Sequence, residues 1–168
     1  MKSVCALMMA AACIGGCKKG GSAGNTAAAK DVMVAFTKPG ADHAALSAAL
    51  RPKAEDYAAV FVGDAATKMK AGLEPLWDGG KLTLKPSAEQ TEIAIAGAPQ
   101  PELAKGDGNA VNCPGGYKGI AASIQPSVVV HCVRFVKPGQ KGGLHVDGLV
   151  YVNDHWALFP KPWRFLKQ

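Results

Sequence analysis

The stretch LHVDGLVYVNDHWALF, residues 144–159, decides the fold of this 168-residue chain. A two-residue turn at Asn153-Asp154 predicts a β-hairpin in which Tyr151 faces Trp156. A hairpin with two apolar faces either lies between other layers of the fold or lines a ligand pocket with one face. The apolar positions are Leu149 and Leu158 beside the aromatic pair, and Val150, Val152, Ala157 and Phe159 on the opposite face.

Three earlier segments also have the pattern of β-strands. Residues 81–85 and 92–95 alternate apolar and polar side chains, and residues 127–137 are rich in valine. The Pro/Gly-rich passage 97–119 predicts a long connection with one helical turn at residues 101–104. The second half of the chain is therefore expected to form an antiparallel sheet that ends in the hairpin.

The first half has helical patterns instead. Asp42 is a suitable N-cap for a short helix, and a second short helix is expected after Pro52, with Tyr57 and Phe61 on one side. A third is expected to begin at Asp64 and to end before Gly79-Gly80. Its apolar stripe has helical spacing and consists of Met69, Leu73, Leu76 and Trp77.

Helices followed by an antiparallel meander predict an α+β fold, with N-terminal helices packed on a curved antiparallel sheet. This order over residues 41–168 loosely resembles the nuclear transport factor two-like, cystatin-like superfold. Enzymes of that superfold place an Asp, His or Tyr inside the cone of the sheet. The resemblance thus implies Asp147, His145 and Tyr151 as catalytic candidates if the protein is an enzyme; the alternative is that they are surface residues near a strand end.

Aromatic residues of the C-terminal region are the candidates for ligand binding. Tyr151, Trp156 and Trp163 would line a pocket, or else pack in the core. The terminal FPKPWRF, residues 159–165, is either an extended strip that docks on a partner or a strand end whose aromatic side chains are buried. No spacing typical of a metal site, phosphate loop or catalytic elbow is present, so neither metal nor cofactor is expected.

The N-terminal segment predicts where in the cell the protein is located. The apolar run from Ser3 to Ile14 is much shorter than the roughly 20 residues of a membrane-spanning helix and is typical of a signal peptide. Its end, Ile14-Gly15-Gly16-Cys17, resembles the lipobox of bacterial lipoproteins. This resemblance implies removal of residues 1–16, acylation of Cys17, and anchoring to the outer membrane facing the periplasm, because Lys18 stands where an inner-membrane signal would have Asp. An ordinary secretory peptide is the alternative.

Residues 17–30 are expected to be the lipidated Cys and a flexible tether, and residues 31–168 a single domain. From Lys30 onward there are 16 basic and 13 acidic residues, a net charge of +3 without a basic face, so nucleic acid is not an expected partner. The membrane is expected as a partner through the lipid. An envelope protein or a small apolar ligand is the further candidate.

Two cysteines, Cys113 and Cys132, remain in the expected domain. In an oxidising compartment they predict a disulfide, although two buried free thiols would also fit. Together these features favour a membrane-anchored periplasmic lipoprotein that binds a partner or small ligand without catalysis. The alternatives are a small-pocket isomerase or dehydratase-type enzyme and a purely structural envelope protein.

Overall fold

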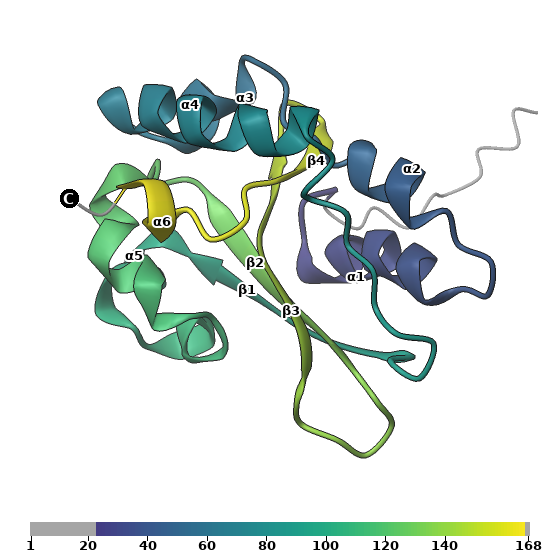
Figure 1. Ribbon diagram of the computed structural model, residues 1–168. Coiled ribbons are helices and arrows are strands. Elements are labelled where there is room, and N and C mark those ends of the chain that lie inside the picture. Colours follow the sequence, from purple (N-terminus) through teal and green to yellow (C-terminus); the bar gives the residue numbers. More distant parts are fainter. Residues whose placement is uncertain (1–22, 167–168) are drawn as a thin grey trace, which may run out of the picture.

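The computed structural model describes residues 23–166. Its four strands form one antiparallel sheet in the order β1-β2-β3-β4, with helical segments before, between and after them (Figure 1). The α+β prediction is confirmed. The elements are α1 (Thr26–Val34), η1 (Ala35–Thr37), α2 (His43–Ala48), α3 (Asp56–Val60), α4 (Asp64–Asp78), β1 (Glu92–Pro99), α5 (Gln100–Lys105), η2 (Gly108–Asn112), η3 (Gly115–Ser123), β2 (Val129–Val136), β3 (Gly143–Val152), β4 (His155–Leu158) and α6 (Trp163–Leu166).

Helices cover both faces of the sheet (Figure 1). On one face, which we call the α4 face, residues of α3, α4, α5 and η3 pack against Val130, Val150 and Phe159. On the other, the α1 face, Met33 and Phe36 pack against Phe135 and Leu149, among others. A sheet that is buried on both sides needs apolar residues at both alternating positions, which explains the composition of the hairpin.

The predicted hairpin is confirmed in register and turn. Tyr151 pairs with Trp156 and Leu149 with Leu158. Asn153 and Asp154 have φ of 46° and 61°, the left-handed conformation that a tight two-residue turn requires. The buried carboxylate of Asp56 accepts a hydrogen bond of 2.8 Å from Asn153 Nδ2, which ties the turn to the start of α3.

Several helical predictions are also confirmed. Asp42 caps α2 by accepting a hydrogen bond from the backbone N–H of Ala45, and the third predicted helix is α4, with Met69 and Leu73 fully buried. Residues 101–104 lie within α5.

The strand predicted at residues 81–85 is wrong, because this segment has no neighbouring strand to pair with. It lies as an extended connection in which Leu84 N donates a hydrogen bond to Ser47 Oγ. Its half-buried Leu82 and Leu84 pack against the helices and the sheet, so packing rather than strand pairing accounts for the alternation.

The predicted tether extends too far. Residues 26–30 belong to α1, where Ala29 is fully buried and Asn25 caps the first turn. An alanine-rich segment after a good N-cap favours helix, and alanine is small enough to pack closely on β1. The signal peptide, the lipobox and Cys17 lie outside the described residues. Within residues 23–166 no helix is both long and apolar enough to cross a bilayer.

Candidate functional site

A β-bulge in β3 decides which side chains meet. Leu144 and Val146 point to the α1 face, but the next residue on that face is Leu149, because Gly148 at φ 90° inserts one extra residue. One extra residue reverses the alternation of every side chain that follows. His145 and Asp147 therefore share the α4 face, whereas Tyr151 lies on the opposite face. The three catalytic candidates thus do not converge on one site.

Asp147 is the most unusual side chain of the site. It is 4% exposed, and its Oδ1 has no hydrogen-bond partner among the described residues. Burial raises its pKa above the ordinary value, and the nearby His145 and Lys161 oppose this only in part. A carboxyl group in this position holds a proton more readily than an exposed one and can then donate a hydrogen bond.

Tyr117, on η3, is a second buried polar group near this carboxyl. Its hydroxyl has no partner in the described part of the chain, and burial together with the charge of Asp147 raises its pKa well above 10.0. Two orphaned polar groups in one region of the core are uncommon, since buried polar atoms normally form hydrogen bonds. They identify this region as a candidate site.

Asp147 lies in a cleft of about 350 Å³ at the edge of β3, beyond the end of β4, where residues from both faces of the sheet contribute to the lining. We call it the Asp147 cleft. Its walls come from the end of α4, from residues 81–84, from β3 and β4, and from the C-terminal segment. Most of the lining is apolar, and the volume is within the range of small-ligand pockets. The lining residues are Leu76, Lys81, Leu82, Thr83, Leu84, Leu144, His145, Val146, Asp147, Leu158, Pro160, Lys161, Arg164 and Phe165.

Two glycines hold α6 in place as one wall of the cleft. A Cβ on Gly72 of α4 would lie 2.3 Å from Phe165 Cδ1, and one on Gly116 of η3 would lie 2.5 Å from Trp163 Cδ2. Only glycine allows such close approach of an aromatic ring to the backbone. Trp163 also packs edge-on against Tyr117, with ring centroids 5.0 Å apart. The alternative in which the terminal aromatic residues pack on the core is therefore the one observed.

A second, more polar cleft of about 240 Å³ lies where η2 meets β1 and β2. Asn109, Asn112, Arg134 and His145 contribute its polar lining, so His145 stands at both clefts. Arg134 donates to the carbonyl oxygen of Lys141, while its buried Nε has no partner among the described residues.

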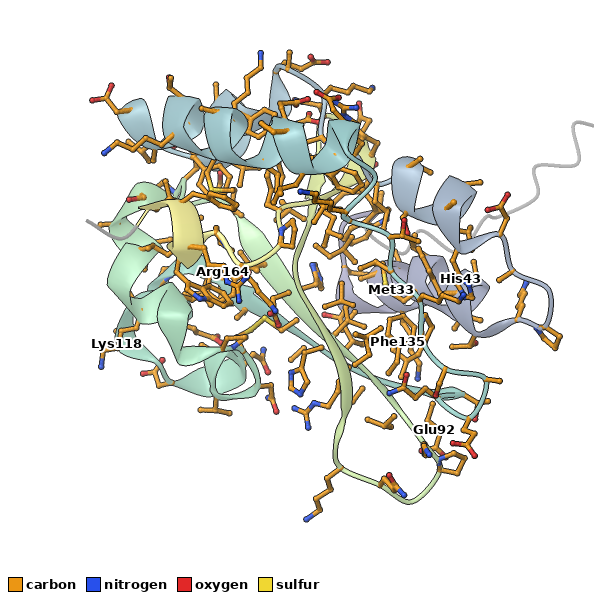
Figure 2. The ribbon with its side chains drawn as sticks, viewed as in Figure 1. Met33, His43, Glu92, Lys118, Phe135 and Arg164 are labelled. Carbon is orange, nitrogen blue, oxygen red and sulfur yellow. A yellow bond between two sulfur atoms is a disulfide. The ribbon has the colours of Figure 1, made fainter. Side chains whose placement is uncertain are left out.

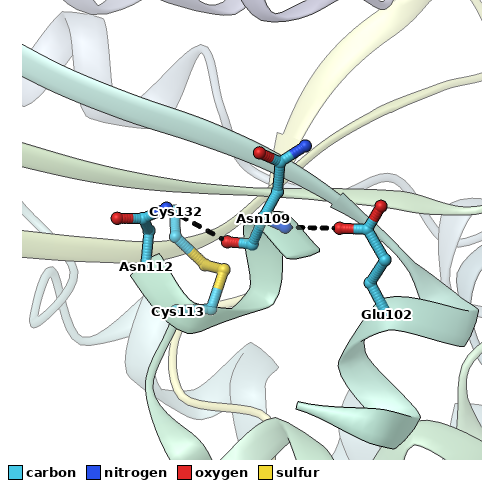
Figure 3. Close-up of a disulfide and its surroundings, with 5 residues drawn as sticks. All are labelled: Glu102, Asn109, Asn112, Cys113 and Cys132. Carbon is cyan, nitrogen blue, oxygen red and sulfur yellow. Dashed lines mark hydrogen bonds between the residues drawn. A yellow bond between two sulfur atoms is a disulfide. The ribbon is translucent and has the colours of Figure 1, made fainter. Parts of the chain in front are cut away.

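The predicted disulfide between Cys113 and Cys132 forms the base of this region (Figure 3), with Cα atoms 5.4 Å apart. It joins the end of η2 to the middle of β2. Glu102 accepts a hydrogen bond of 2.6 Å from Asn109 N, which fastens η2 to α5. Cross-link and hydrogen bond together hold a segment with little regular structure against the sheet.

The three predicted ligand-binding aromatic residues do not converge. Tyr151 and Trp156 contact each other on the α1 face, with ring centroids 5.3 Å apart, and Trp163 lies on the α4 face. Neither cleft is lined by any of them. All three side chains are half-buried, and the two tryptophans pack against the edges of the two core clusters instead.

The cations of the Asp147 cleft escaped sequence analysis. Lys161 and Arg164 are three residues apart in the terminal stretch FPKPWRF, and Lys81 belongs to the segment whose pattern predicts a strand. In the sequence, the only indication of this cluster is that Lys161 and Arg164 flank Pro162 at the start of a short helix. That they face a buried Asp depends on the packing of α6 against α4.

Comparison with protein-family models, with curated proteins and with solved structures finds no match. Residues 23–166 contain no group of three or more His, Cys, Asp or Glu side chains placed to hold a metal ion. The chemistry of the Asp147 cleft therefore has to be argued from its own side chains.

Proposed function

We propose that this protein is a lipid-anchored envelope protein whose domain binds a small ligand in the Asp147 cleft and does not transform it. The observation that carries the proposal is the cleft itself: a largely apolar pocket that contains a buried carboxyl whose Oδ1 has no hydrogen-bond partner within residues 23–166. Leaving such a group unpaired costs about 1–3 kcal/mol, and a ligand that pairs with it recovers part of that free energy.

The anchor is proposed from the lipobox-like sequence that ends at Cys17. Because α1 begins at Thr26, a short linker would hold the domain close to the membrane. One acyl chain binds a membrane only weakly and reversibly, so several chains on Cys17 are needed for stable attachment. Replacement of Cys17 by Ser should move the protein from the membrane fraction to the soluble fraction. Unchanged tight membrane association would contradict lipidation at this residue.

The binding function can be tested by closing the cleft. Thr83 is exposed at its edge, and Thr83→Trp places a large side chain across the opening. Ser87→Trp, in the same connection but outside the cleft lining, is the matched control. We expect small molecules that co-purify with the full chain to be lost in the Thr83 variant and retained in the Ser87 variant, as measured by mass spectrometry of extracts. Equal retention in both variants would contradict binding in the cleft.

A second candidate function is supported by Asp147 and His145 on one strand face. A buried carboxyl with a raised pKa beside an imidazole is a pair that can move a proton in an isomerase or dehydratase reaction. Asp147→Asn keeps the shape of the side chain and removes its acid–base capacity. Turnover of a bound compound that is abolished in this variant, while its binding persists, would establish the enzymatic alternative over simple binding.

A further inference from the structure

The Asp147 cleft has more cationic than anionic side chains in its lining. Lys81, Lys161 and Arg164 are exposed at its rim, and none of them forms an ion pair with another residue of the 23–166 region. Among the described residues that line the cleft, Asp147 is the only acidic one. Three cations around one buried carboxyl produce a positive potential, which attracts anions to the opening.

The cations border an apolar wall. Beyond the rim the lining is largely apolar, contributed by α4, by the 81–84 connection, by two strands and by α6. A pocket with a charged rim and an apolar wall favours a molecule whose charged end stays at the rim while its apolar part is removed from water. The apolar side chains are Leu76, Leu82, Leu84, Leu144, Val146, Leu158 and Phe165.

The guanidinium of Arg164 suits a carboxylate at the rim, since its planar N–H groups can donate two parallel hydrogen bonds to the two oxygens. Asp147 fits the same headgroup when it carries a proton, because it can then donate a hydrogen bond through Oδ1, which has no partner in the described part of the chain. An approaching anion would itself favour that protonated form.

From this arrangement we propose that the ligand is a single-chain anionic amphiphile, with its carboxylate at Lys161 and Arg164 and its alkyl chain along the leucine-lined wall. A volume of about 350 Å³ is at the lower end for ligand pockets and suits one chain rather than the two chains of a bilayer phospholipid. This inference rests on the proposed function and specifies its ligand class.

The test uses the full chain in neutral maltoside micelles and two photoreactive probes, a dodecanoic acid and a dodecanol that both carry a mid-chain diazirine. Labelled peptides are located by mass spectrometry. We expect the acid to label residues of the cleft wall at concentrations about tenfold lower than the alcohol, because only the carboxylate of the acid can form charge-assisted hydrogen bonds with Lys161 and Arg164. Unlabelled dodecanoate should compete.

Variants of the rim residues test whether Lys161 and Arg164 bind the carboxylate. Arg164→Gln and Lys161→Gln should each raise the half-saturating concentration of the acid about tenfold and leave that of the alcohol unchanged. Lys118→Gln is the control: Lys118 is on η3 at the outer edge of the molecule and is not part of the cleft lining, whereas Arg164 belongs to α6 (Figure 2). All three replacements are at exposed positions, and thermal unfolding checks that the fold is retained.

The outcomes separate the two levels of the proposal. Equal labelling of the cleft by acid and alcohol, unaffected by Arg164→Gln and Lys161→Gln, would overturn the anionic class and leave ligand binding in the cleft standing. Labelling spread over the surface, with none concentrated in the cleft, would overturn both the ligand class and the proposed function.

Discussion

Gly148→Ala tests the bulge that places Asp147 in its cleft. At this position φ is 90°, and a Cβ would lie 2.1 Å from the carbonyl oxygen of Phe159. The left-handed backbone costs an L-residue roughly 1–2 kcal/mol, and forcing the strands apart adds roughly 1–3 kcal/mol. The shift would also strain the hydrogen bond from Phe159 N to Gly148 O, now 2.9 Å. We expect the free energy of unfolding to fall by about 2–5 kcal/mol in total.

Gly139→Ala is the matched control, because Gly139 has φ of 74° and nothing within 4 Å of the added Cβ. It should lose only the backbone contribution, about 1–2 kcal/mol. Urea unfolding followed by tryptophan fluorescence measures both variants. With a slope of about 1–3 kcal/mol per molar urea, the Gly148 midpoint should lie on the order of 1 M below that of the control. Equal urea midpoints for the two variants would refute the close approach of Gly148 to Phe159 and the bulge at Gly148.

Three further predictions concern the rest of the domain. Replacing both Cys113 and Cys132 by Ser should lower the free energy of unfolding by about 3 kcal/mol, because the cross-link closes a loop over a sequence separation of 19 residues; an unchanged urea midpoint would argue against a native disulfide. Asp56→Ala should lower the free energy of unfolding by roughly 2–3 kcal/mol, because Asn153 loses its buried hydrogen-bond acceptor. Asn153→Ala should lower it by less, because Asp56 also accepts a hydrogen bond from the Lys53 N–H, which this variant keeps. Burial lowers the pKa of His131 below 6.5, so the folded state binds fewer protons there than the unfolded state, and stability should fall as pH falls below about 6.5; a His131→Phe variant that keeps the same pH dependence between pH 6.5 and 5 would contradict this.

Local sequence was sufficient for the elements that local forces stabilise. Asp42 and Asn153-Asp154 predicted a helix start and a hairpin turn, since cap and turn depend on side chains a few residues apart. Apolar positions at both alternations of residues 149–159 predicted a hairpin covered on two faces or lining a pocket, and the structure has both faces covered. The disulfide followed from the two cysteines that remain in the expected domain.

The candidate site depended on tertiary structure at every step. The alternation of β3 is reversed at Gly148, which separates Tyr151 from Asp147; a glycine makes a bulge plausible at this position but does not show that one forms. Lys161 and Arg164 face the cleft because Phe165 packs over Gly72, a residue far away in the chain. The hydrophobic pattern and the turn residues are local properties, so they can be recognised from the sequence. Asp147 is desolvated, and three cations come close to it, only after segments that are distant in the sequence have packed together.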